Sequence, residues 1–213
     1  MKYATYYEKN ETITYEQYDG MMQELLQEEN NRIVQDVAMR KIIFKSPVTD
    51  VEDRHESVTY SVCMKDFKLN ELYVERKSMQ KSLVFKSYVK ISKKDCSRIL
   101  NQDIAWMKTS NKSLIQDFYL EMTLNGLLPV VMEETVRDIC EKTAEEDGLV
   151  FYKSVKVAKN CYKQFLNKGL PMMDCLNCDR VILSYKKNVK IPSAISNILH
   201  ICNPKARILA YSL

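Results

Sequence analysis

The sequence predicts one α+β domain in which an antiparallel β-barrel is flanked by helices. Several runs of residues alternate between polar and apolar side chains with the period of a strand. Two capping-box motifs and a glycine stop mark helices between those runs. No internal repeat, low-complexity tract or Pro/Gly-rich linker interrupts the 213 residues. Many antiparallel strands with a few covering helices favour a barrel, so we expect a single domain over residues 1–213.

The first predicted helix spans Tyr15–Glu29. Thr14 and Gln17 have the spacing of a capping box, which satisfies the free N–H groups at a helix start. An apolar stripe follows with helical period and comprises Tyr15, Tyr18, Met22, Leu25 and Leu26. Strand-like runs come next at Arg40–Ser46 and Ser57–Met64.

Two adjacent strands between Asn70 and Ser92 carry the strongest signal in the chain. One face of this pair is expected to hold charged and phenolic side chains, namely Glu71, Tyr73, Glu75, Lys77, Lys86, Tyr88 and Lys90. The other face is mostly hydrocarbon and holds Leu72, Val74, Arg76, Leu83, Phe85, Val89 and Ile91. Ammonium groups and phenols that converge on one sheet face suit a polyanion better than a dry core.

The rest of the chain continues the alternation of helices and strands. Ser92 and Asp95 form a second capping box that opens a short helix, and a helix at Ser113–Asn125 stops at Gly126. Another helix is expected to start at Pro192. Further strands are predicted at Leu128–Glu133, Leu149–Ala158, Arg180–Lys186 and Ile208–Leu213.

Composition excludes several classes of protein. A net charge of +4 is too small to demand nucleic acid, and no basic stripe with interleaved aromatic residues occurs, so we expect no nucleic-acid partner. The 4 glycines cannot build a Walker or Rossmann phosphate loop. No apolar run is long enough for a membrane-spanning helix, and the N-terminus is polar. Seven scattered cysteines indicate a reducing, intracellular setting on the cytosolic side.

Residues 71–77 (ELYVERK) resemble the central domain of the vacuolar transporter chaperone (VTC) proteins, which make inorganic polyphosphate from nucleoside triphosphate. That family belongs to the triphosphate tunnel metalloenzymes, whose barrel is lined with Arg and Lys for phosphates and with Glu for a divalent metal. The similarity continues in order through residues 86–90, 99–103, 128–137, 181–192 and 208–211. The resemblance implies phosphate-binding residues at Lys77, Lys86, Lys90, Arg137 and Lys186, with Glu75 as a tunnel carboxylate.

The chain departs from the family pattern at several charged positions. The strand before residues 71–77 lacks the Arg-x-Arg pair, because Val58 to Met64 holds no basic residue. Ser184 stands where the family has a metal-binding Glu, and Ala210 stands where it has a Lys. Phosphoryl transfer depends on metal and Arg/Lys stabilisation, so these losses indicate a degenerate relative that has lost catalytic groups.

Three functional hypotheses stay open from the sequence. The first is a non-catalytic domain that binds polyphosphate or phosphate, or acts as an accessory subunit of a polyphosphate polymerase complex, at a vacuole-like membrane through those partners. The second is an active polymerase or triphosphatase, which would need Mn²⁺ or Mg²⁺; the first needs no cofactor. The third is a structural module whose lumen is filled by apolar side chains, with Phe151, Val62 and Val150 as candidates.

A separate hypothesis concerns zinc. Cys175 and Cys178 have the spacing of a zinc half-site, and His200 with Cys202 could complete four ligands. The second half is irregular, so ordinary buried or loop cysteines are the alternative.

Overall fold

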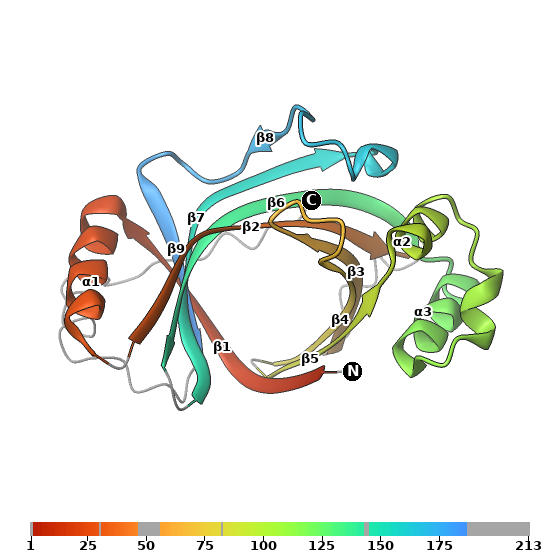
Figure 1. The fold of residues 1–213 in the computed structure, drawn as a ribbon, viewed down its shortest axis with the longest axis horizontal. Coiled ribbons are helices and arrows are strands. Elements are labelled where there is room, and N and C mark those ends of the chain that lie inside the picture. Colours follow the sequence, from red (N-terminus) through yellow and green to blue (C-terminus); the bar gives the residue numbers. More distant parts are fainter. Residues whose placement is uncertain (1, 30, 47–55, 82, 143–144, 187–213) are drawn as a thin grey trace.

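The computed structural model describes residues 2–29, 31–46, 56–81, 83–142 and 145–186 (Figure 1). Its strands are β1 (Lys2–Thr14), β2 (Asn31–Lys45), β3 (Glu56–Lys65), β4 (Leu72–Gln80), β5 (Leu83–Ile91), β6 (Leu128–Lys142), β7 (Glu145–Lys159), β8 (Met173–Asp174) and β9 (Arg180–Lys186). Its α-helices are α1 (Tyr15–Gln27), α2 (Lys93–Leu100) and α3 (Ser113–Leu124), and two short 3-10 turns are η1 (Ala105–Thr109) and η2 (Tyr162–Gln164).

Eight of these strands close into an antiparallel barrel. Neighbouring strands follow the order β6-β2-β3-β4-β5-β1-β9-β7, and an additional pairing of β6 with β7 joins the two ends. β8 pairs with β7 beside this ring. Closure leaves the ring strands with hydrogen-bonded neighbours on both sides, which satisfies their backbone groups. The predicted α+β fold with a barrel flanked by helices is confirmed.

Helices cover the outside of the barrel at two separate places. At both places the apolar side chains of the strands point outward and pack against the helices. α1 packs against β7 and β9, where Phe151, Val181 and Leu183 are fully buried. α2 and α3 lie at the opposite end of the molecule in Figure 1 and cover β3, β4 and β5. Phe118 of α3 stacks on Tyr60 of β3 at a centroid distance of 4.9 Å. The core of this protein therefore lies outside the barrel wall.

This outward core corrects one sequence-based expectation. Val62 and Phe151 are fully buried, but they belong to the two clusters under the helices and do not fill the lumen. Val150 pairs with Ser184, which bonds to a lumen carboxylate, so of the three candidates Val150 takes the inner face. The strand period explains the error, because neighbouring residues point to opposite sides of the wall.

Several predicted elements are confirmed, and their boundaries differ. The first helix begins as predicted, with both capping-box hydrogen bonds between Thr14 and Gln17 present. β1 was not predicted, and β2 begins nine residues before the expected Arg40. The helix expected at Pro192 and the strand expected at Ile208–Leu213 lie outside the described residues. Among the described residues, no helix is both long enough and apolar enough to cross a membrane.

Candidate functional site

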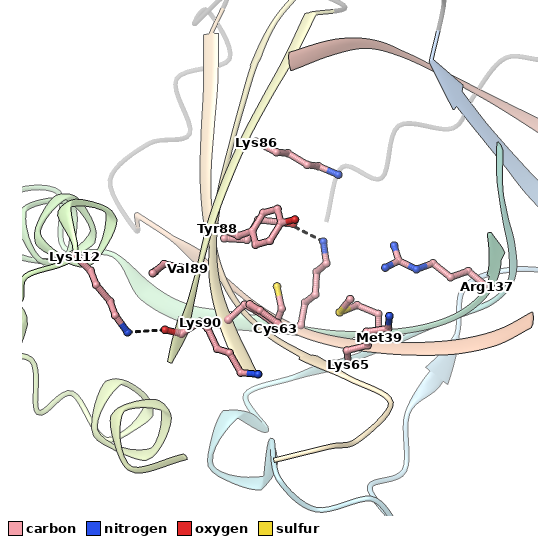
Figure 2. Close-up of a pocket in the computed structure, with 12 residues that line it drawn as sticks. Met39, Cys63, Lys65, Lys86, Tyr88, Val89, Lys90, Lys112 and Arg137 are labelled. Carbon is pink, nitrogen blue, oxygen red and sulfur yellow. Dashed lines mark hydrogen bonds and ion pairs between the residues drawn. The ribbon is translucent and has the colours of Figure 1, made fainter. Parts of the chain in front are cut away.

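The barrel encloses a cavity of about 700 Å³ (Figure 2). Its lining comes from β2 to β6 and from the residue that precedes α3, and comprises Met39, Lys41, Cys63, Lys65, Tyr73, Glu75, Lys86, Tyr88, Val89, Lys90, Lys112 and Arg137. Six of these side chains are basic and one is a carboxylate. An excess of cations in an enclosed site strengthens attraction to anions, because the surrounding protein screens the charges less than water does.

β4 and β5 form one wall of the cavity. Their register pairs Tyr73 with Lys90, Glu75 with Tyr88, and Lys77 with Lys86, so these six side chains share the inner face. Leu72 and Val74, on the outer face, are fully buried in the cluster under α2 and α3. The polar face predicted from the sequence is therefore the lumen face.

β2 and β6 form the facing wall. Their register places Val37 opposite Arg137 and Lys41 opposite Glu133. Figure 2 shows Lys86 and Arg137 pointing into the lumen from opposite walls. The Nε atom of Arg137 is buried and has no hydrogen-bond acceptor among the described residues. An unpaired buried donor lowers the stability of the folded protein until it finds an acceptor. An anion in the lumen would be a suitable acceptor for the Arg137 Nε–H group.

β1 closes the lumen between β5 and β9 and brings two inward residues. The ring of Tyr6 lies 4.8 Å from Lys186 Nζ and 5.6 Å from Lys86 Nζ, measured to the ring centroid. Glu8 Oε2 accepts a hydrogen bond from Lys77 Nζ at 2.9 Å, and Glu8 Oε1 accepts one from the Ser184 hydroxyl at 3.4 Å. Lys77 and Lys186 thus lie on the same inner surface as the cavity lining.

Each of these lumen carboxylates forms an ion pair with a lysine. Glu75 Oε1 lies 2.9 Å from Lys41 Nζ, which reaches it across β3. Burial disfavours the charged form of Glu75, but Lys41 and then Lys86 outweigh burial and lower the pKa of Glu75 to about 2. Burial likewise opposes ionisation of Glu8, and Lys77 nevertheless holds the pKa of Glu8 below its usual value. Both carboxylates are therefore ionised at neutral pH.

The rim of the cavity adds further basic groups. Lys90 pairs with Glu71 at 3.0 Å, and both side chains are partly exposed. Lys112 donates a hydrogen bond to the Lys90 carbonyl at 2.7 Å, which links the start of α3 to β5. Lys65, the last residue of β3, also lines the cavity and forms no ion pair with a described residue. Polyanions that extend out of the lumen would meet these side chains first.

The lining does not fit the divalent metal that the family resemblance implies. Metal sites for Mg²⁺ or Mn²⁺ use carboxylate oxygens that are free to coordinate. The described residues contain no group of three or more His, Cys, Asp or Glu side chains that could hold a metal ion. Glu75 and Glu8 each bond to a lysine, and Ser184 replaces the expected Glu.

The structure brings the six predicted site residues to one inner surface. Glu75, Lys86, Lys90 and Arg137 line the cavity, and Lys77 and Lys186 contact Glu8 and Tyr6 beside it. Arg76 is paired with Tyr60 in the register of β3 and β4, on the outer strand face that the alternation predicted for it. Phosphate binding by the six residues stays a prediction.

Sequence reasoning missed several members of this surface, among them Tyr6, Glu8, Lys41, Lys65 and Lys112. A signal existed for Lys41. Arg40, Ile42 and Phe44 occupy alternate positions of β2 and are buried on one face, so Lys41 lies on the other face. No such signal marks Tyr6 and Glu8, because residues 2–12 do not alternate between polar and apolar side chains.

The zinc hypothesis rests on residues that the structure describes only in part. Cys175 is half-buried and Cys178 is exposed. His200 and Cys202 lie outside the described residues, so the proposed four-ligand set stays a prediction.

Comparisons with known proteins give structural likenesses only. No protein-family model matches the sequence, and no curated protein matches it. A putative adenylate cyclase from Bacillus halodurans is 9% identical, with 94% of this chain and 89% of that chain covered and a TM-score of 0.48. A putative adenylyl cyclase from Hippeastrum with a dominant triphosphatase activity is 9% identical, with 92% and 84% covered and a TM-score of 0.49.

A third similar structure is a chain of a large complex and is not described as a cyclase. A chain of the Mediator head module of Schizosaccharomyces pombe is 8% identical, with 93% of this chain and 92% of that chain covered and a TM-score of 0.48. These scores carry no functional argument. The barrel is established by the strand pairing of this chain itself.

Proposed function

We propose that the barrel lumen binds a linear chain of phosphoryl groups, such as polyphosphate or an inorganic triphosphate, without a divalent metal. One observation carries the proposal: six basic side chains and one carboxylate line a single cavity of about 700 Å³. Lys65, Lys86 and Arg137 form no ion pair with any described residue and are available to an anion. Arg137 supplies a planar fork of donors that matches phosphate oxygens, and the lysines act as point charges.

The arrangement of cations favours a chain over a single phosphate. Lys86 and Lys90 lie four residues apart on β5, which corresponds to roughly 13 Å along a strand. Arg137 faces Lys86 across the lumen. An orthophosphate ion reaches only some of these groups at once, whereas a chain of phosphoryl groups contacts several. Multiple contacts within one ligand raise affinity because the later contacts cost no further loss of ligand freedom.

The same lining supports binding in preference to catalysis. Phosphoryl transfer needs metal and positioned cations at the reacting phosphate, and the lumen carboxylates Glu75 and Glu8 already bond to lysines. The proposal therefore describes a degenerate VTC-like domain that holds polyphosphate, as an accessory subunit in polyphosphate synthesis. An active metal-dependent polymerase or triphosphatase is the alternative outcome of the test.

The test is thermal unfolding in buffer with EDTA, with tripolyphosphate as the ligand and orthophosphate at equal ionic strength as the comparison. A ligand at about 100 times its Kd adds roughly 2.7 kcal/mol to the stability of a protein that binds it only when folded. We expect a clear rise in Tm with tripolyphosphate and a smaller rise with orthophosphate. Lys86→Ala should remove most of the rise, because Lys86 points into the lumen and has no ion pair with the described part of the chain to lose.

Lys94→Ala is the matched control, since Lys94 is exposed on α2 outside the lumen and its loss changes the net charge equally. Loss of the Tm shift in Lys94→Ala as well would show that binding is non-specific. No shift in the wild type would refute phosphate binding. Formation of polyphosphate from ATP, or release of phosphate, that requires Mn²⁺ or Mg²⁺ would replace the proposal with the catalytic alternative.

A further inference from the structure

The lumen contains its own anions. Glu75 lies 2.9 Å from Lys41, and Glu8 lies 2.9 Å from Lys77. The four side chains are between 15% and 34% exposed, so these pairs are shielded from bulk water. Screening is weak in such positions, so each carboxylate would compete for its lysine with any anion that enters the lumen.

The charges around each carboxylate explain why it stays with its lysine. Lys41, Lys86 and Lys77 all stabilise the ionised form of Glu75. Lys77 and Lys86 do the same for Glu8, and Ser184 contributes a hydrogen bond. The two carboxylates thus share the field of Lys77 and Lys86, and Lys41 adds to the field at Glu75. A divalent cation that approached either carboxylate would be repelled by these ammonium groups, whereas an anion would compete for them.

We infer that Glu75 and Glu8 are internal counter-ions that compete with the phosphate ligand for Lys41 and Lys77, and so set the affinity of the lumen for anions without any metal. The inference rests on the proposed function, because competition has meaning only where a phosphate binds. It assigns to these residues a role opposite to metal coordination: they weaken phosphate binding, whereas a metal-bridging carboxylate strengthens it. Their removal therefore gives opposite results under the two roles.

The test is calorimetric titration of tripolyphosphate into wild type, Glu75→Gln and Glu8→Gln, each with EDTA and then with Mg²⁺ or Mn²⁺. With EDTA, we expect each variant to bind about tenfold more tightly than the wild type. Such a gain corresponds to ~1.4 kcal/mol of the repulsion that a carboxylate exerts on a nearby phosphate. Divalent metal should not strengthen binding to the wild type. Glutamine keeps the size of the side chain, so the change isolates the charge.

Glu24→Gln is the control for net charge, because Glu24 is exposed on α1 far from the lumen. Its affinity should equal that of the wild type. A thermal melt of each variant verifies folding, and the two lumen variants lie on different strands, so either one alone decides the question. Equal or weaker binding by a folded Glu75→Gln or Glu8→Gln protein overturns the inference, as does tighter wild-type binding with metal.

The outcomes separate the inference from the proposed function. Tripolyphosphate binding by the wild type, combined with no gain in the variants, removes the inference and leaves the function in place. Binding by the variants alone refutes phosphate binding by the natural protein and, with it, the inference, because the carboxylates then exclude the anion instead of setting its affinity. Absence of binding in all of them refutes both.

Discussion

At the residue scale, Glu75 shows how a charged group can be stabilised inside a barrel. Burial acts against its carboxylate, but Lys41, Lys86 and Lys77 lower its pKa from an ordinary 4.5 to about 2. A carboxyl group with a depressed folded pKa adds stability above its unfolded pKa. That contribution is lost as pH falls from about 4.5 toward about 2.

The first prediction follows from this linkage. Glu75→Gln should lower the free energy of unfolding by ~1–3 kcal/mol at pH 7, because Lys41 loses its partner in a shielded position. The difference between wild type and variant should shrink as pH falls from 4.5 to 2. Urea unfolding at pH 7, 4 and 2.5 measures it. A difference that stays constant over this range would show that the carboxylate has no depressed pKa, and Glu24→Gln should show no difference at any pH.

At the element scale, the helix starts are the best-specified features of the chain. The Ser92 hydroxyl accepts a hydrogen bond from the Asp95 N–H at 3.0 Å, and Asp95 Oδ2 accepts one from the Ser92 N–H at 3.3 Å. Both are local contacts between residues three apart, so the sequence alone predicts them. α2 then carries Cys96, Ile99 and Leu100 into the outer core.

A second prediction tests this local control. Ser92→Ala should cost ~1 kcal/mol of stability, the usual effect of losing an N-cap. Tripolyphosphate affinity should not change, because α2 packs outside the barrel wall. Urea unfolding and calorimetric titration measure the two quantities, with Lys94→Ala as a control for a change on the same helix. A loss of affinity in Ser92→Ala would mean that α2 shapes the lumen.

The strands show where prediction from sequence stops. β4 and β5 were predicted because hydrocarbon and charge separate cleanly onto their two faces. β1 was missed because neither of its faces is a hydrocarbon face: Tyr6 and Glu8 look into a polar lumen, while Tyr3 and Tyr7 are exposed. The usual signal of a strand is one buried apolar face, and β1 has none until Ile13.

At the scale of the whole molecule, the ion pairs across the lumen depend on ring closure. Lys41 reaches Glu75 across β3, and Glu8 reaches Lys77 although the two are 69 residues apart in sequence. Local spacing cannot predict such pairs, because they require the register of several strands at once. The sequence could therefore predict a cationic face on β4 and β5, but not which of the lumen lysines would form ion pairs with carboxylates.

The proposed anion-binding role implies that the inner surface makes the ligand-free barrel less stable than it could be. Arg137 carries this cost most clearly, since its Nε is buried without an acceptor and it forms no ion pair with a described residue. An unsatisfied buried donor costs about 1–3 kcal/mol, and functional sites commonly retain such costs. Stability and ligand binding should therefore respond in opposite directions when Arg137 is replaced by an apolar side chain of similar length.

The last prediction concerns Arg137→Met. Without ligand, its Tm should rise by about 2–4 °C, which corresponds to ~1 kcal/mol for a chain of this size. The rise in Tm on adding tripolyphosphate should become much smaller than in the wild type. Arg32→Met, on an exposed part of β2, removes the same charge and should change neither quantity. A lower Tm in Arg137→Met, or an undiminished ligand shift, would show that Arg137 supports the barrel and not an anion. A higher Tm without ligand together with a diminished ligand shift would locate the binding surface inside the ring, where Arg137 points into the lumen.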